Sequence, residues 1–181
     1  QIRRQPSNPQ TPDSVIALKM MKMLLAIPII FSILPSLGWG QDVQKELEAY
    51  QRGSVAYAQG DYSAALKEWT PLALGEQGNA SVQYSLGEMY FYGIGVLYDS
   101  KVAAKWHKLA AEQGFAPSQL KLSKLYSSGA GVIFSSELAH MWANIATSNG
   151  EKDSREFMDY LSRGMSENQL EKALDLAREC V

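Results

Sequence analysis

Apolar positions after residue 42 recur with the 3.6-residue period of an amphipathic helix. In the stretch KVAAKWHKLAAEQG, Ala103, Trp106 and Ala110 fall at i, i+3 and i+7 and therefore share one helical face. The stretch ELAHMWANIATSNG repeats this arrangement around Trp142. Alanine lets two helix backbones approach closely while the indole fills the remaining space. We therefore interpret these tryptophans, together with Trp69, as packing between helices rather than as ligand contacts.

Matching residues return at a constant spacing of 36. The pairs are Tyr90 and Tyr126, Gly93 and Gly129, Gly95 and Gly131, Val96 and Val132, Trp106 and Trp142, Ala110 and Ala146, and Gly114 and Gly150. A fixed period of this length is the signature of a repeat architecture. Each copy reads as a helix, a glycine turn and a second helix, and such a hairpin buries its apolar face only by stacking on another copy.

The G-x-G motif of Gly93 and Gly95 has two readings, a phosphate-binding loop or a turn between helices. A phosphate loop follows a strand, occurs once and normally has a longer glycine pattern. Here the motif follows a helical segment and occurs twice. The sequence therefore favours the turn, with one or more of its glycines at positive φ.

The chain divides into three predicted repeats and a C-terminal cap. The repeats cover about residues 43–78, 79–114 and 115–150, and the first is the most diverged. Residues 151–181 lack the repeat signature and read as two capping helices with a polar outer side. Such caps keep the end of a repeat stack soluble.

The second capping helix is expected to bury one face. Ser166 and Gln169 have the spacing of a capping box at its start. Leu170, Ala173 and Leu174 then share a helical face with Ala177, and we expect that face to pack on the last repeat.

Residues 21–40 read as a secretory signal peptide. Lys22 supplies a positive charge, an apolar run of 14 residues covers 24–37, and Gly38 and Gly40 provide small residues for a cut after Gly40. The run is shorter than the roughly 20 apolar residues of a comfortable membrane span. An uncleaved membrane anchor is the alternative. We interpret residues 1–20, which begin without Met, as an upstream or disordered leader.

The charge balance argues against nucleic acid as a partner. Loss of residues 1–40 removes four basic residues and one acidic residue, which changes the net charge from −2 to −5. Cys180 is the only cysteine, so no internal disulfide forms. His107 and His140 occupy different repeat positions without a second histidine or cysteine at metal-ligand spacing, and we interpret them as solvated or rim histidines. We expect no metal and no cofactor.

One copy carries a specific resemblance to a known family. Its residues are Leu86-Gly87-Glu88-Met89-Tyr90, Gly93-Ile94-Gly95-Val96, Asp99, Ala103 with Trp106, and Ala110-Ala111-Glu112-Gln113-Gly114. This pattern resembles the Sel-one-like repeat family, whose members are related to the tetratricopeptide repeats. The third copy is looser, because Ser123 replaces the helix glycine and no aspartate follows Val132.

The resemblance implies an all-α fold, a right-handed α/α superhelical solenoid of stacked helix-turn-helix repeats. It also implies a non-enzymatic adaptor that binds other proteins, and some bacterial members act in the cell envelope. We therefore expect a periplasmic or secreted monomer without stable membrane insertion of the mature chain. A cell-wall or β-lactam-related hydrolase is one alternative, although the paired cysteines of the relatives proposed to act on β-lactams are absent. A structural envelope component without a discrete ligand is another.

The same resemblance places the first helix of each hairpin along a concave groove. Carrying the LGxxY register over to this chain gives candidate partner-binding residues, which are Tyr50, Tyr57, Ser81, Tyr84, Glu88, Phe91, Tyr92 and Lys124. Clustered aromatic residues on a concave surface favour the binding of a protein or peptide.

Overall fold

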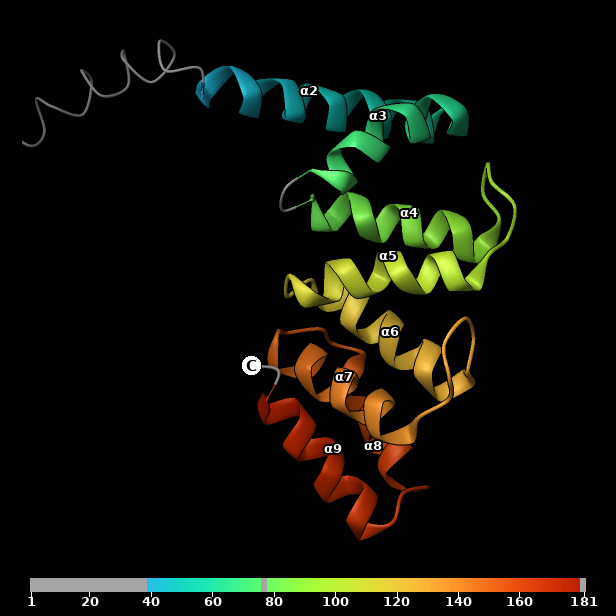
Figure 1. Cartoon of the computed structure of the whole chain (residues 1–181), viewed down its shortest axis with the longest axis vertical. Helices are drawn as coiled ribbons and strands as arrows, with labels where there is room; N and C mark the ends of the chain where they lie inside the picture. Colours follow the sequence, from blue (N-terminus) through green and yellow to red (C-terminus); the bar gives the residue numbers. More distant parts are fainter. Residues whose placement is uncertain (1–38, 76–77, 180–181) are drawn as a thin grey trace, which may run out of the picture. The chain divides into compact units, whose positions relative to one another are not determined.

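The computed structural model describes residues 39–75 and 78–179, which form helices joined by turns and contain no strand (Figure 1). The helices are α2 (Trp39–Ala58), α3 (Tyr62–Leu74), α4 (Ala80–Tyr92), α5 (Ser100–Glu112), α6 (Ala116–Ser128), α7 (Ser136–Ser148), α8 (Ser154–Ser162) and α9 (Glu167–Glu179). The predicted leader, nearly all of the predicted signal peptide, and Cys180 lie outside the described residues. Within these ranges, no helix combines the length and apolarity that crossing a membrane requires.

The chain divides into two compact units, residues 1–47 and residues 48–181. In the second unit, α4 pairs with α5 and α6 pairs with α7, and each hairpin packs on the next through α3 against α4 and α5 against α6. Helices α8 and α9 both cover α7. The predicted all-helical solenoid is confirmed for this unit (Figure 1).

The core follows the predicted alanine and tryptophan positions. Trp69 and Trp142 are buried, and Trp106 is half-buried against the cluster that contains Trp69. Ala103 and Ala110, the small partners on the α5 face, are completely buried. The tryptophans are therefore part of the helix-helix packing, as predicted.

Helix α4 approaches α5 closely because residue 87 is a glycine. A Cβ on Gly87 would lie 2.7 Å from two atoms of the His107 ring, which is too close for a side chain. The next hairpin has different residues at the equivalent contact between its two helices. Ser123 stands at the position of Gly87, the residue that corresponds to His107 is Ala143, and the Ser123 hydroxyl donates to the carbonyl of Ala139. Both positions therefore differ between the two copies, with a larger residue on the first helix and a smaller one on the second.

The G-x-G motifs form turns, which confirms the sequence interpretation. Gly93, Gly95, Gly129 and Gly131 all have φ between +68° and +75°. A Cβ on Gly131 would collide with the backbone of Ser100, because the α6–α7 turn packs directly against the start of α5. This glycine therefore serves both a left-handed conformation and a close approach between successive turns.

Buried amide side chains connect each hairpin to the one before it. Gln83 of α4 donates from Nε2 to the carbonyl of Ala73 near the end of α3, at 3.0 Å. One repeat later, Gln119 of α6 donates to the carbonyl of Ala111 near the end of α5, again at 3.0 Å. The oxygen of each glutamine accepts a bond from an amide at the end of its own hairpin, and these donors are Gln113 and Asn149. The sequence analysis missed these connections.

The C-terminal cap is held by polar and apolar contacts. Ser166 and Gln169 form the predicted capping box, since the Ser166 backbone N–H donates to the Gln169 side chain and the Gln169 N–H donates back to the Ser166 hydroxyl. Ala173 and Ala177 are buried as expected. Leu174 is exposed, which corrects the prediction, and Leu176 packs against the core in its place.

Replacing Gln119 with leucine tests the amide connection between hairpins. Leucine has a similar size but leaves the Asn149 amide without its partner and removes the bond to Ala111. We expect the free energy of unfolding to fall by about 1–3 kcal/mol, measured by urea denaturation. Gln51→Leu on exposed α2 is the matched control, and an equal effect of both substitutions would contradict the structural role of Gln119.

Candidate functional site

Tyrosines from α2 and α4 surround one open groove. These two helices are the first helices of successive hairpins, and their side chains enclose a volume of about 420 Å³. Five of the eight predicted site residues line this tyrosine groove, and they are Tyr50, Tyr57, Tyr84, Glu88 and Tyr92. The remaining lining residues are Ser54, Trp69, Ser85 and Ile94. The structure thus brings together residues that are up to 42 positions apart in sequence.

The other three predicted residues lie elsewhere. Lys124 lines a neighbouring hollow of about 280 Å³ together with Tyr84. Phe91 and Ser81 line neither space. Phe91 precedes Tyr92 by one residue and is therefore rotated by about 100° around the helix. It packs instead against the core of the following hairpin.

A polar cluster on one side of the groove joins three helices. Lys121 of α6 places Nζ 2.8 Å from Oε1 of Glu88, and Nε2 of His107 on α5 lies 3.4 Å from the same oxygen. The Lys121 ammonium also sits 4.9 Å from the ring centroid of Phe91 and 5.0 Å from that of Tyr92. The carboxylate therefore has a cation beside it, and that cation is additionally stabilised by the aromatic rings. Lys121 was missed because it belongs to the next repeat.

Burial and pairing oppose each other in this cluster. Burial alone would raise the pKa of Glu88, but the neighbouring His107 and Lys121 outweigh it and lower that pKa. Burial would lower the pKa of Lys121, but the Glu88 carboxylate raises it above its ordinary value. Burial raises the pKa of the Tyr84 phenol, and the charge of Glu88 adds to this. At neutral pH the groove therefore holds a charged Glu88–Lys121 pair beside the neutral phenol of Tyr84.

Both histidines are buried, which corrects the prediction of solvated or rim positions. His107 is 0% exposed, because it fills the space that Gly87 leaves open on α4. Neither of its ring nitrogens has a hydrogen-bond partner within the described residues. His140 of α7 is buried, and its Nε2 lies 3.0 Å from the hydroxyl of Ser162 on α8. Burial lowers the pKa of both histidines, and the carboxylate of Glu88 or Asp159 only partly offsets it.

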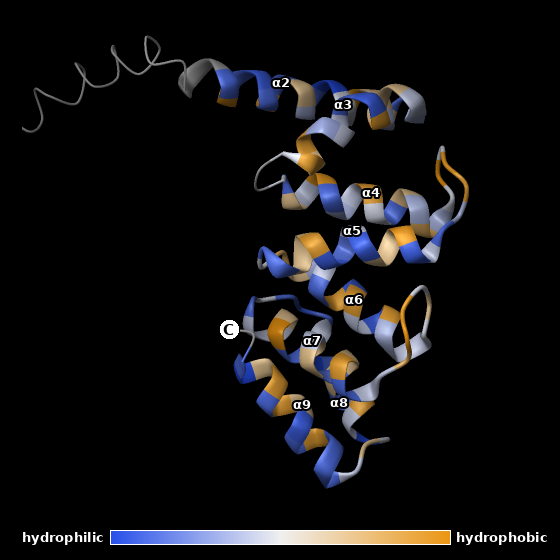
Figure 2. Cartoon of the chain, viewed as in Figure 1, coloured by the Kyte–Doolittle hydropathy of each residue, from blue (hydrophilic) through white to orange (hydrophobic). Residues whose placement is uncertain are grey.

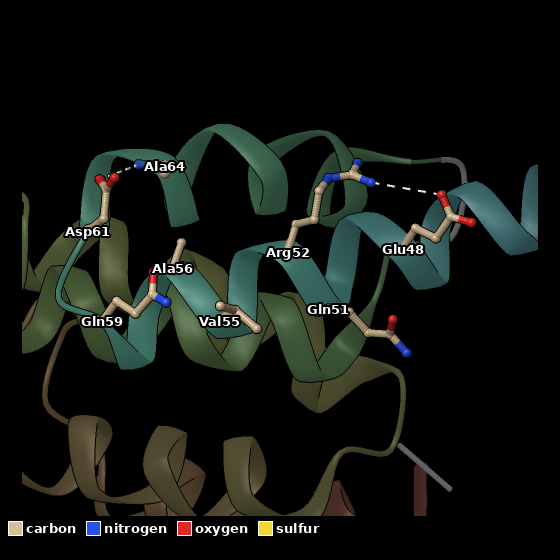
Figure 3. Close-up of a pocket in the computed structure, with 8 residues that line it drawn as sticks. All are labelled: Glu48, Gln51, Arg52, Val55, Ala56, Gln59, Asp61 and Ala64. Carbon is tan, nitrogen blue, oxygen red and sulfur yellow. Dashed lines mark hydrogen bonds and ion pairs between the residues drawn. The ribbon is translucent and has the colours of Figure 1, made fainter.

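A second hollow lies between α2 and α3, where eight residues line about 460 Å³ (Figure 3). Its arginine is already engaged, since Arg52 contacts Glu68 at 2.9 Å and Glu48 at 3.9 Å. The Asp61 carboxylate accepts the backbone N–H of Ala64 as a helix cap. The charges of this hollow are therefore used within the fold. Across the described part of the chain, no three His, Cys, Asp or Glu side chains are grouped to hold a metal ion.

Comparison with known proteins identifies the repeats. The Sel1 repeat model matches residues 80–115 and 116–151, each one residue later than the predicted boundaries of the second and third copies. The resemblance to Sel-one-like repeats is thereby confirmed for these two copies. The predicted first copy, residues 43–78, lies outside the two matches and stays a prediction. No curated protein matches the chain.

Two solved structures share the fold. One is a protective antigen present in uropathogenic Escherichia coli strains that displays an SLR fold, with 24% sequence identity and a TM-score of 0.68 over 75% of this chain. The other is a Sel1 repeat protein from Oxalobacter formigenes, with 27% identity and a TM-score of 0.59 over 70% of this chain. The aligned region spans 29% of the first protein and 96% of the second.

The buried histidines predict a loss of stability between pH 7.5 and pH 5.5. Histidines of the unfolded chain take up protons near pH 6.5, whereas His107 and His140 resist protonation in the folded chain because their pKa is lowered. Stability is therefore fully present above pH 6.5 and decreases below it, by at most about 1.4 kcal/mol per histidine at pH 5.5.

Thermal melting followed by circular dichroism over this range measures the effect. The double variant His107→Asn and His140→Asn should show a flatter dependence of melting temperature on pH. A slope that is the same in both proteins would mean that the histidines are not responsible.

Proposed function

We propose that this chain, which carries two Sel1 repeats, is a non-enzymatic scaffold that binds a protein or peptide partner through the tyrosine groove. Sel1 repeats commonly serve as protein-interaction scaffolds. The observation that carries the proposal is the convergence of Tyr50, Tyr57, Tyr84 and Tyr92 on one open groove between two hairpins.

Exposure of the aromatic rings favours a partner over a purely structural role. Tyr92 is 60% exposed, and Tyr50, Tyr57 and Tyr84 are each half-buried. Tyrosine and tryptophan dominate the energetic centres of protein interfaces, because a rigid ring buries a large area and a hydroxyl offers a hydrogen bond. Since the rings are presented by helices of two stacked hairpins, little conformational entropy is lost when a partner binds.

The electrostatics of the groove favour a peptide over a small charged substrate. The carboxylate of Glu88 is already paired with Lys121, so the formal charges beside the groove balance. Its remaining polar groups are mainly phenol hydroxyls, which suit the amides of a peptide backbone. An acyl-transfer enzyme needs a nucleophile, a base and an oxyanion site directed at one point. The two serines of the groove, Ser54 and Ser85, donate their hydroxyls to backbone carbonyls of their own helices, and Glu88 is paired with Lys121, which supports a scaffold rather than the alternative hydrolase.

The proposed site of action is the bacterial cell envelope. The support comes from the sequence, where Lys22, the apolar run of 24–37 and the small Gly38 and Gly40 fit an exported protein. A scaffold exported in this way would meet its partner in the periplasm or outside the cell.

Truncation of Tyr92 tests the groove. The chain is immobilised, partners are captured from an envelope extract, and the affinity of each captured protein is then titrated. We expect Tyr92→Ala to weaken binding at least tenfold, in keeping with about 2 kcal/mol for an aromatic anchor. The ring is 60% exposed, so the melting temperature should change little.

Tyr98→Ala provides the matched control. Tyr98 is 62% exposed and lies on the α4–α5 turn, outside the groove. If Tyr98→Ala abolishes capture while Tyr92→Ala does not, the partner binds the turn edge and the proposed groove is wrong.

Export is tested by the mass of the recovered protein. Expression in a bacterium should give a periplasmic or secreted chain that begins at Gln41. Gly40→Leu should block or shift this cleavage, because signal cleavage requires a small residue immediately before the cut. A native chain that keeps Met21 and stays in the membrane fraction would contradict export with cleavage.

A further inference from the structure

We propose that a second site, between the α6–α7 turn and helix α8, binds the apolar C-terminal end of a peptide through its free carboxylate. The site goes beyond the tyrosine groove and shares none of its lining residues. It encloses about 720 Å³, which is within the size range of ligand sites in proteins. We call it the Arg163 hollow, and its main lining residues are Phe134, Phe157, Tyr160, Leu161, Arg163 and Met165.

Large apolar side chains remain exposed around this hollow. Phe134 on the α6–α7 turn is 63% exposed, and Tyr160 on α8 is 66% exposed. The rings of Phe157 and Tyr160 stack on each other, with centroids 6.1 Å apart and planes inclined by 21°. An exposed apolar patch with a hollowed centre is typical of a binding surface. Figure 2 shows an apolar stretch, coloured orange, on the turn between α6 and α7.

Arg163 is the only formally charged residue that lines the hollow. It forms no ion pair or hydrogen bond through its side chain within the described residues. A second cation lies nearby, since Lys124 Nζ is 5.8 Å from the ring centroid of Phe157. A guanidinium offers two parallel N–H donors that match the two oxygens of a carboxylate. The hollow therefore combines apolar walls with an unpaired positive charge, which is complementary to an apolar group that ends in a carboxylate.

A peptide C-terminus fits better than a fatty acid. A fatty acid has one polar end, whereas a peptide also brings backbone amides that need partners. The hydroxyls of Ser127 and Ser136 line the hollow. Ser136 donates to the carboxylate of Glu137 and already accepts a bond from the Gln169 side chain, so it is engaged within the fold. Ser127 donates to the carbonyl of Lys124, so the lone pairs of its oxygen remain able to accept an amide N–H. The Ser127 oxygen therefore offers one acceptor for a backbone N–H of the peptide, beside apolar walls that suit its side chains.

Arg163 is also the C-cap residue directly after α8, where a positive charge stabilises the helix weakly. A change of stability on its substitution therefore does not distinguish the two roles. Only a measurement of ligand binding distinguishes a role in carboxylate recognition from a role in helix stability, so binding is the quantity measured.

The probes are N-acetyl-leucyl-phenylalanine with a free carboxylate and the same dipeptide with a C-terminal amide. Each is titrated into the ¹⁵N-labelled full chain, and amide shifts of residues around the hollow are followed by NMR. We expect the acid to bind at least tenfold more tightly than the amide. Arg163→Gln should remove this difference, whereas Arg155→Gln, an exposed arginine at the start of α8 outside the hollow, should preserve it.

The remaining outcomes decide against the proposal. Equal binding of acid and amide, shifts located elsewhere, or no saturable shifts of either probe would overturn the site. Octanoate that binds as tightly as the acid dipeptide would overturn the peptide assignment. The variant Tyr92→Ala should leave acid binding unchanged, so failure of the tyrosine groove and failure of the Arg163 hollow are distinguishable.

Discussion

The hydrogen bond from a buried glutamine to the end of the preceding hairpin determines how the repeats stack. The last carbonyls of a helix lack donors within the helix, and burial makes an unpaired carbonyl costly. Gln83 and Gln119 supply that donor at equivalent positions, and each accepts a bond from an amide at the end of its own hairpin. Apolar packing alone tolerates sliding between helices, whereas this bond selects one register. The stack is therefore specified by polar as well as apolar contacts.

The tyrosine groove depends on that register. Its walls come from α2 and α4, and the charge of Glu88 on α4 is balanced by Lys121 on α6. Three successive hairpins thus contribute to one surface, and a shift of one hairpin along its neighbour would separate the ion pair by several ångströms. His107 is buried beside this pair, with Nε2 3.4 Å from the Glu88 carboxylate, so the groove rests on a buried polar group whose protonation is disfavoured. Groove geometry and pH-dependent stability are consequently linked.

The sequence predicted the elements and turns because both recur with the 36-residue period. It predicted most of the groove, because the tyrosines follow a helical register. It did not predict His107 as buried, because burial depends on the pair that His107 forms with Gly87. In the next copy Ser123 and Ala143 exchange the large and small roles, and comparing single positions between copies hides this compensation. Lys121 was missed for a similar reason, since its role is defined by a contact across hairpins.

The tyrosine groove and the Arg163 hollow differ in how their charges are used, and this difference bears on specificity. In the groove, Lys121 neutralises Glu88, so aromatic area supplies most of the binding energy and the charge pair adds little selectivity. In the hollow, Arg163 is exposed and unpaired, so a ligand that covers the guanidinium without a carboxylate removes its water and leaves its charge unpaired. Desolvating an unpaired charge is costly. The affinity of ligands without a carboxylate is therefore lowered by more than the affinity of ligands with a carboxylate is raised. A partner that engages both surfaces would therefore gain affinity mainly from the groove and selectivity mainly from the hollow.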